Sequence, residues 1–199
     1  MSVNLQKGQK VNLRKNDKEE LKRVMVGLGW DEVEQKRGLF GFLKPAQDID
    51  CDASAILCKD GKLVDFKTDV VFYNNLRHGT GAVEHQGDNL TGAGDGDDEQ
   101  IFVDLGALPN DYDRIVFVVT IYQAVERRQH FGLIQNAFIR ICDSANGSEF
   151  CKFNLSDDYN GKTAMIVGEI VKSEGEWKFN AIGQGTNDNG ILEIAKRFA

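Results

Sequence analysis

The sequence predicts an all-β fold, a β-sandwich with a few short helices that include one at the C-terminus. Three observations support this class. The 199 residues contain 21 glycines but 2 prolines, as expected for a chain with many turns. Short segments of β-branched and aromatic residues recur along the chain, with turn residues between them. Segments with a helical period are scarce. The length suits one domain over residues 1–199.

The first half of the chain contains three predicted strands. Residues 23–30 are apolar and β-branched and run into a glycine-rich turn. Residues 49–58 alternate between two faces, with the acidic members on one face near the start, and residues 59–62 supply the next turn. Residues 70–75 are β-branched and aromatic, so they are predicted as a strand as well.

The second half predicts a central strand and two hairpins. Residues 101–105 are predicted as a strand, and residues 114–122 form a nearly continuous apolar run, which is typical of a strand with both faces covered. Asn146-Gly147 is a strong hairpin signal between strands at 137–142 and 149–155. A second hairpin is predicted from 164–171 and 177–182.

Two short helices are predicted. Residues 126–134 form a connector after the central strand, and residues 191–198 form one or two amphipathic turns after Gly190. The sequence shows no linker, low-complexity tract or internal repeat.

The composition limits the class of function. The net charge is −7 and the pI is about 5.0, which argues against a large basic footprint for nucleic acid. No segment has the apolar length of a membrane span, and the first residues lack the pattern of a secretory signal. We therefore expect a cytoplasmic protein, with peripheral attachment to the inner face of the membrane as an alternative.

Four cysteines give no sign of a structural zinc site. None of the four forms a C-x-x-C pair. Cys51 and Cys58 are an odd number of residues apart, so they are expected on opposite faces of one strand. A symmetric hairpin about Asn146-Gly147 places Cys142 directly opposite Cys151, which leaves open whether the two are bridged or pack as buried thiols.

An acidic, glycine-rich segment runs from His85 to Glu99. It holds five carboxylates and four glycines and almost nothing apolar. The carboxylates repel one another at close range, and glycine lets the backbone fold tightly enough to direct several oxygens to one point. Calcium takes six to eight such oxygen ligands. The segment therefore predicts a calcium site, and a solvated acidic loop is the simpler alternative.

Known loop motifs do not fit this segment. An EF-hand starting at Asp95 has Gln100 in the place of the required glycine and Gly106 in the place of the bidentate glutamate. The segment is no phosphate cradle either, because its aspartates would repel a phosphate. Any metal loop here is of another kind.

Catalytic constellations are not evident, so we expect a protein that is not an enzyme. His78, His85 and His130 are dispersed, and no serine lies in a G-x-S-x-G elbow. His78 and His85 flank the acidic segment, where hydrogen bonding or capping is the expected role. General acid catalysis needs a desolvated carboxylate, whereas these carboxylates cluster.

Motifs along nearly the whole chain resemble the TerD family of tellurium-resistance and stress proteins. The longest matches G-D-N-x-T-G-x-G-x-G-D-D-E without a gap at residues 87–99. The other matching segments, in chain order, are Gly27-Leu28-Gly29-Trp30-Asp31, Asp50-Cys51-Asp52-Ala53-Ser54, Phe72-Tyr73-Asn74-Asn75, Phe117-Val118-Val119-Thr120-Ile121, Asn136-Ala137-Phe138-Ile139-Arg140 and Trp177-Lys178-Phe179.

The resemblance implies a β-sandwich that binds two calcium ions in neighbouring loops, with a role in resistance to tellurite and other stress. It implies no known reaction. The ligands carried over by position are Asp50, Asp52, Asn74, Asn75, Asp88, Asn89, Asp95, Asp97, Asp98 and Glu99. In this interpretation the ions order the acidic segment and present a surface to partners, namely other stress-response or tellurite-resistance proteins, some of them membrane-associated.

Two alternatives stay open from the sequence. One is calcium-dependent docking to membrane lipid or carbohydrate, with the ions bridging to anionic groups. The other is an enzyme that uses metal-assisted hydrolysis or the thiols, and the latter would require an exposed cysteine of low pKa.

Overall fold

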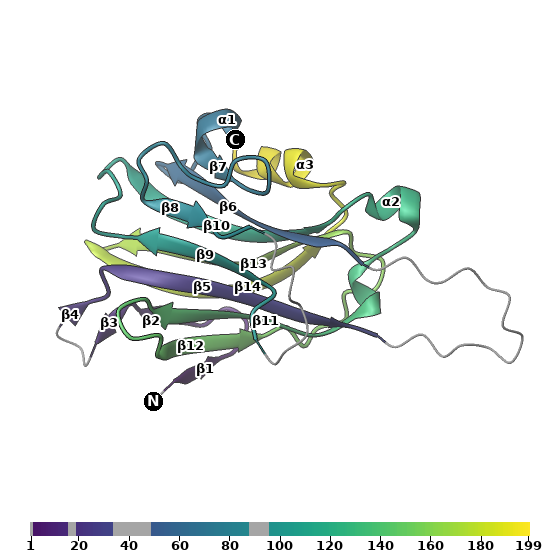
Figure 1. The fold of residues 1–199 in the computed structure, drawn as a ribbon, viewed down its shortest axis with the longest axis horizontal. Coiled ribbons are helices and arrows are strands. Elements are labelled where there is room, and N and C mark those ends of the chain that lie inside the picture. Colours follow the sequence, from purple (N-terminus) through teal and green to yellow (C-terminus); the bar gives the residue numbers. More distant parts are fainter. Residues whose placement is uncertain (1, 16–18, 34–48, 88–95) are drawn as a thin grey trace, which may run out of the picture.

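Two β-sheets packed face to face form most of the structure, which is a computed structural model that describes residues 2–15, 19–33, 49–87 and 96–199 (Figure 1). Within these ranges, sheet A has six strands, in the order β1 (Val3–Leu5), β12 (Glu149–Asn154), β11 (Ile134–Asp143), β5 (Arg23–Glu32), β9 (Glu99–Asp104) and β8 (Val83–His85). Sheet B has six, in the order β2 (Lys10–Asn12), β14 (Glu176–Thr186), β13 (Ala164–Ser173), β10 (Tyr112–Ile121), β6 (Cys51–Lys59) and β7 (Val70–Val71). The predicted all-β sandwich is confirmed.

Strand pairing in both sheets is antiparallel except between β1 and β12, which run parallel. A small pair, β3 (Arg14–Lys15) and β4 (Glu19–Glu20), follows β2. The predicted hairpin of β13 and β14 is confirmed. Its turn places Glu174 and Gly175 at φ 56° and 82°, the left-handed values that a two-residue hairpin turn requires.

The main core lies between the sheets, and a second core covers the outer face of sheet B. The inner core includes Leu28, Phe117 and Phe179. The outer core joins Val116 and Val118 of β10 to the C-terminal helices α3 (Ile191–Ala195) and η2 (Lys196–Phe198). Both faces of β10 are covered, which explains why nearly all of its residues are apolar. The predicted central strand and the predicted C-terminal helix are both confirmed.

Three short elements differ from the prediction. The predicted strand at 70–75 ends at Val71, since backbone hydrogen bonds between Phe72 and Asn75 close a tight turn. It is preceded by helix α1 (Phe66–Asp69), which Asp65 caps by accepting the Lys67 N–H. The predicted helix at 126–134 is divided into α2 (Ala124–Arg127) and the 3-10 turn η1 (Phe131–Leu133), because Arg128 adopts a left-handed φ of 56°.

The expected pairing of Cys142 directly opposite Cys151 is wrong. In the hairpin of β11 and β12, Cys142 pairs with Glu149 and Ile141 pairs with Cys151, because the register shifts between Ile141 and Cys142. All four cysteines lie in the described ranges and are buried free thiols. Cys51 and Cys58 face different cores, as their spacing predicts.

Candidate functional site

Carboxylates from three strands meet at one end of the sandwich, which we call the acidic end. It consists of Asp31 and Glu32 at the end of β5, Asp50 and Asp52 at the start of β6, and Asp97, Asp98 and Glu99 at the start of β9. The C-terminal end of β5 and the start of β6 lie with α2 toward one extreme of the long axis (Figure 1). Sheet A contributes β5 and β9 and sheet B contributes β6, so both sheets contribute to the acidic end.

Asp50 and Asp52 flank the buried Cys51 in the sequence, at the start of β6. Burial raises the pKa of Cys51 well above its usual range, and the negative charges of Asp52, Glu99, Asp50 and Glu32 raise it further. These four carboxylates are therefore close enough to share one electrostatic environment. The spacing of Asp50 and Asp52 in the sequence correctly predicts that both lie on the same strand end.

Asp97, which precedes β9, is held by an arginine of β11, two strands away in sheet A. Its side chain is 0% exposed, and both of its oxygens accept hydrogen bonds from Arg140, with Nε to Oδ1 at 2.7 Å and Nη2 to Oδ2 at 3.0 Å. Gln100 donates a third hydrogen bond, to Oδ2, at 3.0 Å. This is the fork geometry in which guanidinium binds carboxylate most firmly.

Asp98 lies near two other negatively charged carboxylates, those of Asp31 and Asp97. One oxygen accepts the Trp30 N–H at 2.7 Å. Burial raises the pKa of Asp98, the Trp30 hydrogen bond opposes this, and the charges of Asp31 and Asp97 raise it again. A group whose ionised form is disfavoured in this way gains when a cation approaches.

Glu99 joins the two sheets through the backbone of Ala53. One Glu99 oxygen accepts the Ala53 N–H, and His85 Nε2 donates to the Ala53 C=O at 3.1 Å. The Gly87 N–H binds the other ring nitrogen of His85 at 2.9 Å, which leaves Nε2 as the donor. The expectation that His85 forms hydrogen bonds is confirmed.

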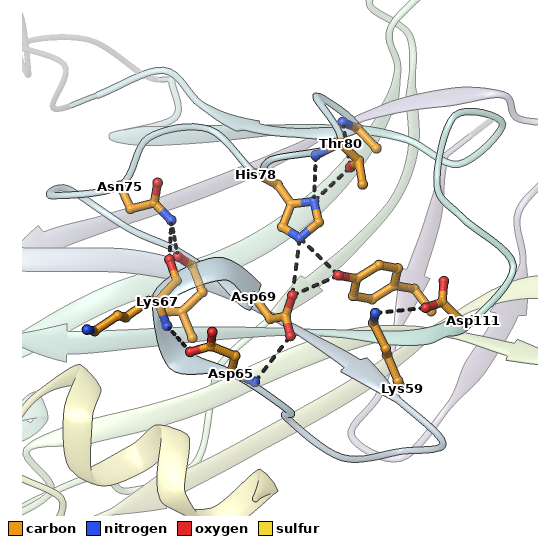
Figure 2. A network of polar contacts seen from close by, with 11 residues as sticks. Lys59, Asp65, Lys67, Asp69, Asn75, His78, Thr80 and Asp111 are labelled. Carbon is orange, nitrogen blue, oxygen red and sulfur yellow. Dashed lines mark hydrogen bonds and ion pairs between the residues drawn. The ribbon is translucent and has the colours of Figure 1, made fainter.

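The asparagine pair lies in the turn after β7. The Asn75 amide donates to the C=O of Val70 at 2.8 Å, so its NH₂ group is directed toward α1 (Figure 2). Asn74 is exposed. The turn does approach the acidic end, because the charges of Asp52 and Asp50 add to burial in raising the pKa of Tyr73.

Three of the predicted ligands, Asp88, Asn89 and Asp95, lie outside the described residues. Within the described ranges, no group of three or more His, Cys, Asp or Glu side chains has the geometry to hold a metal ion. The donor set of the acidic end is nevertheless the one that calcium prefers, carboxylate oxygens with an amide nearby.

Several residues of this end were missed by the sequence reasoning. Asp31 and Glu32 extend β5 into it, and Glu32 accepts the Ile49 N–H at 2.6 Å. Arg140 and Gly27 form the seat of Asp97. Asp31, Gly27 and Arg140 lie in segments that match the family. A glycine or a charged residue that interrupts an otherwise apolar strand is the feature of the sequence that could have indicated a role at the acidic end.

A second polar cluster is buried near α1 and consists of Asp69, His78 and Tyr112 (Figure 2). Asp69 Oδ1 accepts the Tyr112 hydroxyl at 2.7 Å and His78 Nε2 at 3.4 Å. The Thr80 N–H binds His78 Nδ1 at 3.3 Å, which leaves Nε2 as the donor. Burial and the Asp69 contact raise the pKa of Tyr112 to about 12. The cluster therefore ties α1 to β10 and to the turn before β8.

The cysteines are unsuited to thiol chemistry. Burial raises the pKa of Cys58 to about 11 and of Cys151 to about 12, and it also raises the pKa values of Cys51 and Cys142. A reactive thiol needs the opposite, an accessible sulfur with a lowered pKa. The alternative of thiol-dependent catalysis finds no support in this geometry.

We expect the native protein to resist alkylation. Iodoacetamide near pH 8 should leave all four cysteines unmodified on the timescale that labels four in guanidinium, because the thiolate form is both inaccessible and unfavourable. Intact mass spectrometry measures this directly. Rapid labelling of native Cys142 or Cys151 would contradict the burial described above.

No helix within the described ranges is long and apolar enough to cross a membrane.

Comparison with known proteins yields relatives along the entire chain. A family model described as the TerD domain matches residues 1–198. The chain is 48% identical over 200 residues to stress response protein SCP2 of Bacillus subtilis (strain 168), with 100% of both chains covered. It is 46% identical over 185 residues to tellurium resistance protein TerD of Serratia marcescens, covering 93% of this chain and 91% of the relative.

A solved structure supports the sandwich. It is described as a homologue of the telluride resistance protein TerD from Streptomyces coelicolor and aligns with a TM-score of 0.61 at 24% identity, covering 86% of this chain and 94% of the other. At that identity the likeness supports the fold alone.

Proposed function

Because the chain belongs to the TerD family, we propose that it is a non-catalytic calcium-binding protein of the tellurite-resistance and stress-response type. Two relatives that cover nearly all of it carry the names stress response protein and tellurium resistance protein. The proposed setting is the cytoplasm. Calcium, when bound, would supply a double positive charge that neutralises the acidic end.

The observation that carries the calcium proposal is the convergence of carboxylates from β5, β6 and β9. Four of them act together on Cys51, and two more raise the pKa of Asp98. Folding brings these like charges together at an electrostatic cost, and a hard cation with oxygen ligands removes it.

The proposed ligands differ in how free they are to bind an ion. Asp50 is exposed, and Asp98 uses one oxygen for the Trp30 N–H. One oxygen of Glu99 is engaged by Ala53. The proposed ligands for the two ions are Asp50, Asp52, Asn74, Asn75, Asp88, Asn89, Asp95, Asp98 and Glu99. Asp97, the tenth residue of the set that the resemblance implies, has both of its oxygens bonded to Arg140.

We expect calcium to raise the thermal stability of the protein. At a free concentration a hundredfold above the dissociation constant, binding to the folded state alone stabilises it by about 2.7 kcal/mol. Thermal unfolding in calcium and in excess chelator measures the shift, and a calcium titration followed by NMR gives the stoichiometry.

Two variants test which residues are responsible for the calcium-dependent shift, and the second of them is a control. Asp50→Asn combined with Asp52→Asn should reduce the calcium-dependent shift, whereas Glu174→Gln, an exposed charge on the hairpin of β13 and β14, should retain it. If the wild-type melting temperature is the same in calcium and chelator, the calcium proposal is wrong.

A second candidate is calcium-dependent docking to anionic lipid or carbohydrate. The supporting observation is a pair of exposed tyrosines, Tyr73 at 47% and Tyr122 at 40% exposure, beside Asp50 and Asp52. Aromatic side chains with a polar tip suit an interface with a partner or a membrane surface. Flotation with anionic liposomes, with and without calcium, separates this candidate from docking to another stress-response protein.

A further inference from the structure

We propose that Arg140 is a positioning residue that clamps the acidic end through Asp97, so that Asp97 serves as an anchor of the site instead of a metal ligand. The part of this inference that concerns calcium rests on the function proposed above. The part that concerns the clamp rests on the geometry of sheet A.

The seat of Asp97 is a row of three residues across sheet A. Arg140 on β11 and Gln100 on β9 both pair in register with Gly27 on β5. Leu28 and Val26 point into the core, so Gly27 faces outward. The Asp97 carboxylate lies over Gly27 and accepts hydrogen bonds from the residues on both sides of it.

Glycine at position 27 is a requirement of this seat. A Cβ at that position would lie 2.3 Å from Asp97 Oδ1. At Gly29, a Cβ would lie 2.5 Å from the Phe138 ring and 3.2 Å from the C=O of Gly96. The two glycines therefore leave the space on the outer face of β5 that residues 96 and 97 occupy.

The clamp leaves little for an ion at Asp97. Both of its oxygens are bonded to one guanidinium, and the side chain is 0% exposed. A bidentate ion pair with a fully buried carboxylate is costly to break, because without Arg140 the charge of Asp97 is buried and uncompensated. An ion would have to displace Arg140 before it could bind this carboxylate.

The clamp instead fixes the two carboxylates that follow. The Asp98 N–H donates to the Leu28 C=O at 2.8 Å, and Glu99 pairs with Leu28 in register. With Asp97 held one residue earlier, Asp98 accepts the Trp30 N–H and Glu99 accepts the Ala53 N–H. Residues that orient metal ligands in this way typically change affinity by about 10–100-fold when they are removed.

The test uses the full chain and the variants Asp97→Asn, Arg140→Gln and their combination. Arg114→Gln is a matched control, because Arg114 forms a similar pair with Glu169 on sheet B, at 28% and 10% side-chain exposure. Arg140→Lys keeps the charge but loses the fork. Calorimetric titration with calcium gives the stoichiometry and affinity, and urea unfolding in chelator gives the coupling between the two residues.

The expected result is an unchanged number of bound calcium ions in Asp97→Asn and Arg140→Gln, with affinity lowered about tenfold or more in both. Arg140→Lys should fall between wild type and Arg140→Gln, and Arg114→Gln should retain wild-type affinity. In chelator, the double variant should be no less stable than the less stable of the two single variants, because the two residues act as one unit and the double variant leaves no unpaired carboxylate at position 97.

Two outcomes would overturn the clamp. One is the loss of a whole calcium ion in Asp97→Asn while Arg140→Gln binds normally, which would make Asp97 a ligand. The other is additive unfolding shifts in chelator, which would make the two residues independent. If the wild type binds no calcium, the proposed function fails, but the coupling measured in chelator still decides whether the clamp exists.

Discussion

Asp69→Ala should lower the free energy of unfolding by about 3–5 kcal/mol, because it removes the acceptor at the centre of a buried polar cluster. The Tyr112 hydroxyl, His78 Nε2 and the Asp65 N–H all donate to this carboxylate, at 2.7, 3.4 and 3.2 Å. Asp69 and His78 are 3% and 4% exposed, so water cannot replace the lost acceptor. Urea unfolding at neutral pH measures the loss.

The control for this prediction is Asp65→Ala, which removes the cap of the same helix. Its expected cost is about 1 kcal/mol, since one exposed side-chain hydrogen bond to the Lys67 N–H is lost. Equal losses for the two variants would show that Asp69 acts only through the helix α1 and that the cluster contributes nothing of its own.

The effect of Asp69 should also depend on pH in a defined direction. Burial alone would raise its pKa, but the hydrogen bonds from Tyr112 and His78 outweigh burial and hold the pKa below the ordinary 3.8. A lowered pKa in the folded state stabilises the protein above the unfolded-state value and loses that effect as the pH falls through the folded-state value. The difference between wild type and Asp69→Ala should therefore shrink below about pH 4.

Gly27→Ala should destabilise the protein by about 3 kcal/mol, although it adds one methyl group to a strand. The new Cβ would lie within 2.5 Å of three atoms of the Asp97 carboxyl group. Because Asp97 is held by Arg140 and Gln100 on either side, the carboxylate can yield only by breaking its hydrogen bonds.

Gly79→Ala is the matched control for Gly27→Ala. A Cβ at Gly79 would meet nothing within 4 Å, so its expected effect lies within about 0.5 kcal/mol. Thermal and urea unfolding of both variants should be measured in chelator, so that calcium binding does not enter the comparison. If Gly27→Ala is as stable as the wild type, the Asp97 carboxylate can move away from Gly27 without loss of stability, and the prediction is wrong.

The large strands and the chemistry at one end of the fold could be predicted from the sequence. The apolar run of β10 indicates a strand that is covered on both faces, and α3 with η2 supplies the second cover. The concentration of aspartate and glutamate indicates the acidic end, and the alternation along β6 places Asp50 and Asp52 together. These signals are local, so a single segment carries each of them.

What could not be predicted depends on pairing between distant segments. The row of Arg140, Gly27 and Gln100 exists only in the register of three strands, and no segment contains more than one of them. The register shift beside Cys142 is a further example, because a bulge has no strong signal in composition. Helix α1 is four residues long, too short for its period to be detected.

The two hydrogen bonds at Ala53 also prevent the edge of sheet B from pairing with another molecule. Among the described residues, β7 pairs with Ala55 and Ile56 of β6, so without the contacts at Ala53 its backbone N–H and C=O would lie unpaired beyond the end of β7. Glu99 and His85 occupy both groups from the opposite sheet. Exposed edges of this kind promote strand addition and aggregation. Loss of either side chain should therefore make the folded protein prone to self-association, whether or not an ion is bound.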